Sequence, residues 1–257
     1  MSNTKDMSKR QARRDQIRRK EQRGRIIGII LITIGALFVA FLIIWPNLKP
    51  VKGITVVTTN PRPQADKNSM GDPKAIVKIV EFSDYQCPFC KRFFKDTEPS
   101  LVESYISTGK VYFTYRSTGN WVSRNSNSGL TESEDAAMAA YCGGDQNMFW
   151  QMHDMLFANN QDVEDSGSFV DRRLTSIAQA AGLDMTKFND CFSTKKFKSQ
   201  VDQDGKDALT AGVQGTPSFV MTYTDASGKE VSELIEGAQP FSTFQEKIDA
   251  ALVASGK

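Results

Sequence analysis

The longest apolar segment of the chain lies near its N-terminus and contains no charged residue. It covers residues 26–45 (IIGIILITIGALFVAFLIIW), and as a helix it would be about 30 Å long, enough to cross the hydrocarbon core of a bilayer. A cleaved signal peptide usually has a shorter apolar region, of about 7 to 15 residues, followed by small residues. Here Trp45, Pro46 and Asn47 end the run. The pattern predicts an uncleaved transmembrane anchor; a cleaved signal peptide and a buried soluble helix are the alternatives.

Four short runs later in the chain have the composition of β-strands. They are rich in β-branched and aromatic residues, or alternate apolar with polar residues. The last two runs are separated by Asp225-Ala226-Ser227-Gly228, a sequence typical of a turn between paired strands. The expected strands cover residues 75–82, 111–115, 218–223 and 230–235.

Helical spacing of apolar residues governs most of the remaining chain. A helix should begin at Cys87-Pro88-Phe89-Cys90, directly after the first strand, with a kink at Pro99. This order of elements predicts an α/β fold with a helical subdomain, at about residues 130–211, inserted into a sheet. The other expected helices cover residues 132–142, 146–158, 170–181, 194–210 and 241–253.

Residues 46–72 lie between the apolar run and the first strand, and they predict a linker. This segment holds four prolines and scattered polar residues, a composition that favours a tether over a packed element. A short strand is expected at most at residues 54–58. The predicted organisation is therefore a basic tail at residues 1–25, an anchor at 26–45, the linker, and one domain at 73–257.

The charges are distributed unevenly. Residues 1–25 carry ten Lys or Arg against three Asp or Glu, a local charge of +7, whereas the whole chain has a formal net charge of +2. The remaining chain is therefore net negative and lacks the basic excess that nucleic-acid binding requires. By the positive-inside rule the basic tail should stay in the cytoplasm, with Trp45 at the opposite interface. Everything after residue 46 should then lie on the extracytoplasmic side of a cell membrane.

An extracytoplasmic location changes how the four cysteines are interpreted, because oxidising compartments favour disulfides. Cys87 and Cys90 stand two residues apart at a strand-to-helix junction. There the free N–H groups and the dipole of the helix favour a thiolate on the first cysteine. The pair can store and return two electrons. The alternatives are a zinc site, which would need a second pair of ligands, and a purely structural disulfide.

The sequence around this pair resembles the DsbA-like thiol-disulfide oxidoreductases of the thioredoxin superfamily. The resemblance covers about residues 70–255. It implies a thioredoxin fold with the helical insertion after the second strand, and a cis-proline loop at Pro217 that faces the cysteine pair. The motifs that carry it are Met70-Gly71-Asp72-Pro73 leading into IVEFSDYQCPFC, then AAMAAYC, NMFWQMHDMLF, AGLDMTKFNDC and finally GVQGTPSFVM.

The resemblance also suggests roles for residues around the pair. The backbone of Thr216, before Pro217, should pair with an extended substrate segment. Glu81 is similar to a buried acid that relays a proton to or from Cys90, although a strand-end carboxylate that reaches solvent is the alternative. Some relatives bridge two helices of the insertion, as Cys142 and Cys191 would here. Two buried free thiols are the other interpretation of those two cysteines.

The dipeptide between the two cysteines departs from the pattern of the best-known envelope oxidases. They carry Pro-His, whereas this chain has Pro88-Phe89, so a hydrogen-bond donor near the Cys87 thiolate is missing and Phe89 becomes a candidate substrate contact. Lys91 and Arg92 could partly compensate, but charged residues early in a helix usually face water.

These features predict a membrane-anchored thiol oxidase that donates its Cys87–Cys90 disulfide to exported proteins with reduced cysteines. The resemblance implies that a quinone-linked membrane partner of the DsbB or vitamin-K-epoxide-reductase (VKOR) type restores the disulfide. No bound cofactor, metal or nucleic acid is expected. A reductase or isomerase that uses the same cysteines is the alternative, and a non-catalytic binding or chaperone module is a second one.

Overall fold

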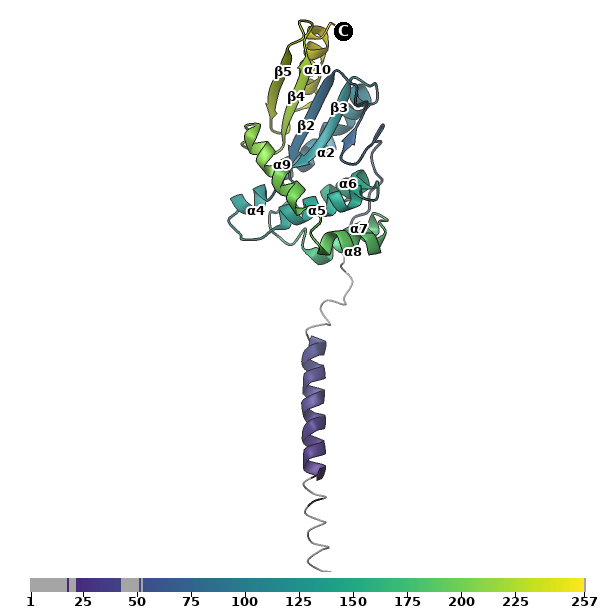
Figure 1. Cartoon of the computed structure of the whole chain (residues 1–257), viewed down its shortest axis with the longest axis vertical. Helices are drawn as coiled ribbons and strands as arrows, with labels where there is room; N and C mark the ends of the chain where they lie inside the picture. Colours follow the sequence, from purple (N-terminus) through teal and green to yellow (C-terminus); the bar gives the residue numbers. More distant parts are fainter. Residues whose placement is uncertain (1–17, 19–21, 43–50, 52, 257) are drawn as a thin grey trace, which may run out of the picture. The chain divides into compact units, whose positions relative to one another are not determined.

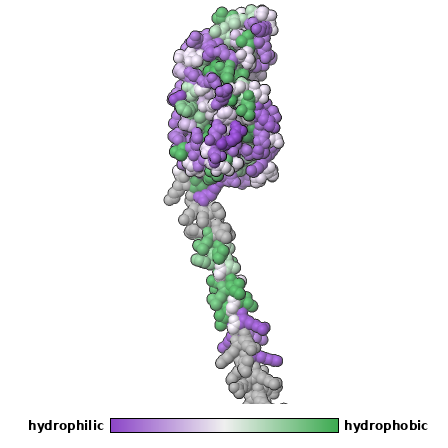
Figure 2. Space-filling view, turned by 90° about the vertical axis from the view of Figure 1, so that its left-hand side faces the viewer, coloured by the Kyte–Doolittle hydropathy of each residue, from purple (hydrophilic) through white to green (hydrophobic). Residues whose placement is uncertain are grey.

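The computed structural model describes residues 18, 22–42, 51 and 53–256. They form two units, described separately below, with a boundary between Pro50 and Val51. The first unit contains a helix, Gln22–Leu42, that is long and apolar enough to cross a membrane. Figure 2 shows that most of its surface is apolar, with hydrophilic side chains at one end, whereas the surface of the second unit is mainly polar. The helix begins within the predicted basic tail at 1–25, before the predicted apolar run. Residues 1–17 and 19–21 of that tail, and Trp45, lie outside the described residues.

The second unit is built on a five-stranded mixed sheet with the order β1-β3-β2-β4-β5 (Figure 1). The central strand β2 is parallel to β3 and antiparallel to β4. The edge strand β5 pairs antiparallel with β4, and β1 pairs antiparallel with β3. The four long strands occupy the predicted positions to within two residues. The strands are β1 (Ser69–Met70), β2 (Val77–Ser83), β3 (Val111–Ser117), β4 (Ser218–Thr224) and β5 (Glu230–Glu236).

Aromatic side chains pack the helices α2 and α10 onto one face of this sheet. Phe93 of α2 lies 4.5 Å from Phe219 of β4, measured between ring centroids, and 5.6 Å from Phe244 of α10. All three rings are buried. Their packing holds α2 against the sheet, next to the end of β2 that precedes Cys87. The helices of this layer are α2 (Pro88–Asp96), α3 (Glu98–Leu101), the π-helix η1 (Val102–Ile106) and α10 (Phe241–Ala254).

The chain between β3 and β4 forms the helical insertion, which lies beyond the carboxyl ends of β2 and β3 (Figure 1). Gly205 of α9 allows the insertion to approach the sheet closely. A Cβ at this position would lie only 3.2 Å from the carbonyl oxygen of Thr118, just after β3. The insertion consists of α4 (Trp121–Asn125), α5 (Glu132–Gly144), α6 (Phe149–Asn159), α7 (Asp171–Ala180), α8 (Met185–Ser193) and α9 (Lys198–Thr210).

Three sequence expectations need correction here. The structure adds α4 and α8, which the periodicity did not predict, and the helix expected from residue 194 begins at Lys198. A residue with positive φ, Lys195, separates α8 from α9. The break in the first helix falls at Thr97 rather than Pro99, because Pro99 lies in the first turn of α3, where a proline loses no hydrogen bond.

The second half of the expected linker belongs to the folded unit. We call residues 53–68 the strap. No strand forms at residues 54–58; instead Thr55 exchanges hydrogen bonds of 2.8 Å with the side chain of Asn159 on α6. Ile54 and Val57 pack against the core. The chain then reaches β1 and turns at Gly71, where φ is +93° and a Cβ would lie 2.5 Å from the Val111 carbonyl oxygen.

Candidate active site

The two cysteines predicted to be reactive lie at the junction between β2 and α2. Cys87 is the N-cap residue of α2, and Pro88 occupies the first helical turn, where its missing N–H has no consequence. The preceding loop is fixed by the buried carboxylate of Asp84, which accepts hydrogen bonds from the backbone N–H groups of Gln86 (2.9 Å) and Val122 (3.2 Å). Cys87 is thus held rigidly at the end of the central strand.

Both thiols of this pair are unbridged in the structure, and their environments differ. Cys87 is 5% exposed, whereas Cys90 has no exposed surface. Hydrogen bonds from the Cys90 thiol, the Thr216 side chain and the first N–H groups of α2 lower the pKa of Cys87 from 9.0 to about 7, although burial acts against them. Burial, and then the neighbouring Cys87, raises the pKa of Cys90 well above its usual value. The arrangement therefore places the thiolate on Cys87 and the thiol on Cys90.

The loop before β4 faces this pair. The Thr216–Pro217 peptide bond is cis, and the Cys87 thiol donates a hydrogen bond of 3.3 Å to the Thr216 carbonyl oxygen. Phe89, between the cysteines, is 53% exposed, and its ring stacks against the guanidinium of Arg92, whose Cζ lies 5.0 Å from the ring centroid. The structure thus brings Thr216, Pro217 and Cys87 together and leaves Phe89 as an exposed aromatic ring beside them.

Glu81 lies inside the molecule rather than at the surface. It is 1% exposed, in the middle of β2, with Tyr115 of β3 and Phe219 of β4 as its register partners. Among the described residues, no donor lies within hydrogen-bonding distance of either carboxylate oxygen. Burial, and then the nearby charge of Glu98, raises the pKa of Glu81 from 4.5 to about 8. The alternative of a solvent-reaching carboxylate is therefore wrong, and Glu81 holds a proton at neutral pH.

A group of buried charges near Glu81 was not expected from the sequence. Arg62 of the strap pairs with Glu98 of α3 and, at 2.6 Å, with Asp154 of α6. His153, the chain's single histidine, lies 2.9 Å from Asp154 through Nδ1 and is fully buried. One signal was present: adjacent His and Asp residues interrupt the apolar helix FWQMHDMLF, which indicates a buried polar contact.

Lys91 does not serve the thiolate and does not face water. Its side chain is mostly buried, and its Nζ donates to the Asn160 carbonyl (2.7 Å) and pairs with Asp162 (2.8 Å). The ammonium therefore ties α2 to the loop after α6. The expectation that this charge faces solvent is wrong, because the insertion covers that side of the helix.

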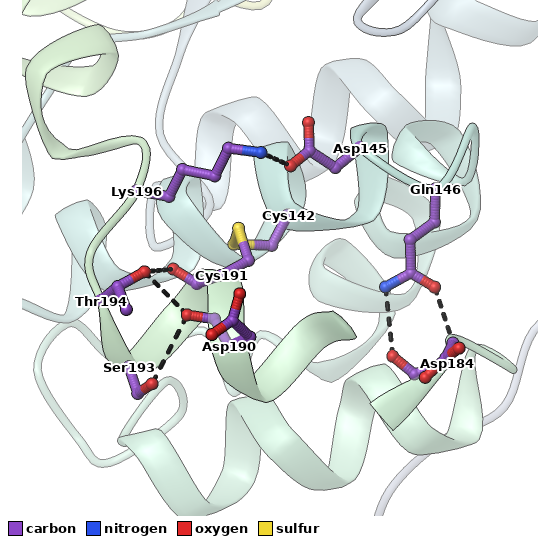
Figure 3. The surroundings of a disulfide bond; sticks show 9 residues. All are labelled: Cys142, Asp145, Gln146, Asp184, Asp190, Cys191, Ser193, Thr194 and Lys196. Carbon is purple, nitrogen blue, oxygen red and sulfur yellow. Dashed lines mark hydrogen bonds and ion pairs between the residues drawn. A yellow bond between two sulfur atoms is a disulfide. The ribbon is translucent and has the colours of Figure 1, made fainter. Parts of the chain in front are cut away.

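The second pair of cysteines forms a disulfide between α5 and α8, with 2.03 Å between the sulfur atoms of Cys142 and Cys191 (Figure 3). Its neighbours are already paired with one another: Lys196 with Asp145, and Gln146 with the backbone of Asp184. The described part of the chain contains no group of three or more His, Cys, Asp or Glu side chains placed to hold a metal ion.

Comparisons with known proteins agree with this arrangement. A family model described as Thioredoxin matches residues 64–250. The chain is 30% identical over 155 residues to a probable disulfide bond formation protein D of Bacillus anthracis, across 59% of this chain and 68% of that protein. Among solved structures it is similar to oxidised BdbD from Bacillus subtilis, with a TM-score of 0.60 and 22% identity, covering 77% of this chain and 99% of that one. This last likeness concerns the fold.

A different kind of relative matches over a longer alignment. The chain is 26% identical over 228 residues to the Na(+)/H(+) antiporter NhaA 1 of Salinispora arenicola. The alignment covers 82% of this chain but only 32% of the antiporter. The chain thus spans about a third of the length of this relative, so the likeness concerns one part of the antiporter and not the whole protein.

Proposed function

The chain belongs to the thioredoxin family, and we propose that it is a DsbA-like thiol-disulfide oxidoreductase that introduces disulfides into exported proteins by passing on a Cys87–Cys90 disulfide. One observation carries this proposal. Cys87 lies at a helix N-terminus against the Thr216 carbonyl, while Cys90 and the protonated Glu81 are buried behind it.

The exchange begins when a substrate thiolate attacks the Sγ of Cys87. A mixed disulfide forms, the bond between Cys87 and Cys90 breaks, and Cys90 leaves as a thiolate. A second substrate thiolate then attacks the substrate sulfur of the mixed disulfide and releases Cys87. Cys87 is a good leaving group because its thiolate accepts several hydrogen bonds.

Protons balance in this scheme. The substrate loses two electrons and two protons, and the enzyme takes up both electrons. Glu81 protonates Cys90, whose thiolate is unfavourable in its buried position, and recovers a proton from solvent. The other proton leaves to solvent whenever Cys87 remains a thiolate.

The loop at Thr216–Pro217 also provides a site for substrate binding. In the reduced structure the Cys87 thiol donates to the Thr216 carbonyl oxygen. A Cys87–Cys90 disulfide has no thiol hydrogen, so that carbonyl becomes free to accept a hydrogen bond from an extended substrate segment. The exposed ring of Phe89 supplies apolar contact beside it.

The location and the partner are part of the proposal. The helix Gln22–Leu42 anchors the chain in the cell membrane by one span, with the catalytic domain on the extracytoplasmic side. A quinone-linked membrane thiol oxidase of the DsbB or VKOR type then reoxidises the pair. Protease added to intact spheroplasts should digest residues beyond 46 and leave the basic tail protected, whereas free soluble protein would contradict this topology.

One paired measurement tests the direction of electron flow. As an oxidase, the protein should have a reduction potential nearer to about −120 to −180 mV than to the roughly −270 mV of thioredoxins. Alkylation trapping in cells should then find the Cys87–Cys90 pair mostly oxidised. A potential near −270 mV with the pair held reduced would establish a reductase instead.

The reductase alternative has an observation in its favour. With a pKa of about 7 for Cys87, ionisation stabilises the reduced form at pH 7 by only about 0.4 kcal/mol, equivalent to roughly 10 mV. Thiolate stability alone therefore does not make this protein a strong oxidant at neutral pH. The same potential measurement decides between the two directions, and a binding module without redox activity would fail any thiol-exchange assay.

A further inference from the structure

An exposed arginine lies beside the reactive cysteines. Arg92 is solvent-exposed on α2, and its Cζ lies 5.0 Å from the centroid of the Phe89 ring. Phe89 is itself one of the two residues between Cys87 and Cys90. Residues three apart share one face of a helix, and helical side chains lean towards its N-terminus. The guanidinium of Arg92 therefore lies over the first turn of α2, although its own Cα is more than a turn beyond Cys87.

The charge of Arg92 is not neutralised by the described part of the chain. No carboxylate there forms an ion pair with its guanidinium, which stacks on Phe89 instead. The neighbouring Lys91 differs, because its ammonium pairs with Asp162 at 2.8 Å. Consecutive helical residues point in directions about 100° apart, so Lys91 and Arg92 serve different sides of α2. Arg92 thus presents a cation that can still bind a carboxylate.

The aromatic ring makes this cation suitable for binding. A long side chain that is free in solvent loses rotamer entropy when it binds a partner, and stacking on Phe89 restricts Arg92 beforehand. The N–H groups at the edge of the planar guanidinium remain able to donate two parallel hydrogen bonds to a carboxylate. Aromatic residues and arginine are also enriched in protein interfaces.

We propose that Arg92 is a specificity-determining residue of the exchange reaction, which favours substrates with Asp or Glu beside the reactive cysteine. The inference rests on the function proposed above and names a substrate class for it. The substrate cysteine forms its mixed disulfide with Cys87, so the residues next to that cysteine lie close to the first turn of α2. There the Thr216 carbonyl orients the substrate backbone, and Arg92 binds a carboxylate side chain.

The charge of the remaining chain acts in the opposite direction. Outside the basic tail at residues 1–25 the chain is net negative, so its overall field disfavours the approach of acidic substrates. A cation held at the redox motif offsets this repulsion at the place where the substrate cysteine reacts. The preference should therefore depend on Arg92 itself and not on the overall charge of the protein.

The test uses two dithiol peptides that differ only in the residues flanking their cysteines, which are Glu in one peptide and Gln in the other. The full chain in detergent micelles, with Cys87 and Cys90 oxidised, is mixed with each peptide, and the rate of peptide oxidation is measured. Glu also alters the reactivity of the peptide's own thiols, and Arg92 could alter the Cys87 thiolate. Both effects cancel when the Glu-to-Gln rate ratio is compared between protein variants.

This ratio should be about threefold higher for the unaltered protein than for Arg92→Met at low salt. The difference should shrink at high salt, because ions screen exposed charges. Arg92→Lys should retain part of the preference, and Arg92→Glu should lower the ratio below that of Arg92→Met. Phe89→Leu should also lower the ratio, because it removes the ring that holds the guanidinium in place.

Lys95 provides the matched control. It is a second exposed cation of α2, almost one turn further from Cys87, so Lys95→Met removes the same charge without altering the proposed site. Its ratio should equal that of the unaltered protein. An equal fall in Lys95→Met and Arg92→Met would overturn the inference, because the preference would then come from the general charge of the helix.

The remaining outcomes separate this inference from the proposed function. Equal ratios in the unaltered protein, Arg92→Met and Arg92→Glu would overturn the specificity role, while oxidation of both peptides would leave the exchange function in place. If the unaltered protein oxidised neither peptide, the proposed function would fail and the inference would fail with it. The direction of electron flow in the cell does not affect the result, because every reaction starts from the oxidised protein.

Discussion

The molecule contains two pairs of cysteines that are both buried but have opposite characters. Cys87 and Cys90 lie at a strand-to-helix junction and are unbridged. Cys142 and Cys191, 49 positions apart, join two helices of the insertion. Near the first pair lie the N-terminus of α2, the cis-proline loop at Pro217 and the Glu81 carboxyl, which has no hydrogen-bond partner among the described residues. The polar groups around the second pair bind one another. In this molecule the two pairs therefore differ in their polar surroundings and not in their burial.

The largest expected effect is the loss of thiol exchange when Cys87 is replaced, and it tests the contrast between the two pairs. Cys87→Ser removes the sulfur that forms the mixed disulfide with the substrate, so thiol exchange should fall to the uncatalysed rate. A dithiol peptide substrate and an insulin reduction assay both measure this loss. Replacing Cys142 and Cys191 together by Ala should leave exchange close to that of the unaltered protein, and comparable losses in the two variants would abolish the distinction between the pairs.

The same double variant should have its effect on stability instead. The bridge closes a loop between residues 49 positions apart, and its loss should lower the free energy of unfolding by about 3 to 4 kcal/mol. Denaturant unfolding of the oxidised protein measures this difference. Peptide mapping without reductant should recover Cys142 linked to Cys191, and free thiols at both positions would contradict the structural role.

Glu81→Gln should slow thiol exchange at Cys87 and Cys90 and should increase the stability of the fold. The pKa of Glu81 rises from 4.5 to about 8 in the folded protein, so the native state holds a proton that the unfolded chain releases. The stabilising effect of this proton is complete below pH 4.5 and is lost as the pH rises towards 8. Gln carries no such pH-dependent penalty and should stabilise the protein by about 3 kcal/mol at pH 7.

Unfolding measured between pH 4 and pH 9 checks this prediction. The advantage of the Gln variant should be small at pH 4, grow up to about pH 8 and then level off. Exchange should slow in the same variant because Cys90 loses its proton donor. An advantage that does not change with pH would mean that Glu81 is not protonated in the fold.

The smallest expected effect concerns the residue between the reactive cysteines. Phe89→His introduces a donor near Cys87, and a fall of its pKa from about 7 to about 6 would add roughly 1 kcal/mol of thiolate stability at pH 7, or about 20 mV. The pH profile of alkylation and the reduction potential report this change. Phe89→Ala is the control, because it removes the ring without adding a donor and should leave the pKa of Cys87 higher than Phe89→His does.

Local patterns in the sequence predicted the strands and the reactive motif, because each depends on neighbouring residues. β-Branched and aromatic composition or alternation predicted the strands, and the position of Pro88 predicted the start of α2. The helix α8 was missed although Asp184 caps it by accepting hydrogen bonds from the N–H groups of Thr186 and Lys187. The apolar repeat in that segment covers few residues and cannot be separated from the repeats of the adjacent helices.

The charges below the site could not be predicted in this way. Arg62 and Asp154 are 92 residues apart along the chain, and the segment around Arg62 has the local composition of a linker. Its order comes from contacts with α3 and α6, which no local pattern encodes. The same holds for Lys91, whose partner Asp162 belongs to a loop 71 residues away.

The position of Arg62 above Trp150 also gives the protein an internal optical reporter. Trp150 lies beneath the guanidinium and 5.0 Å from the His153 ring, measured between centroids. The chain has three tryptophans, and this indole is one of the three sources of its tryptophan fluorescence. Detachment of the strap would remove the cation from its face and admit water. The emission of Trp150 should therefore show, without any label, whether the strap is docked.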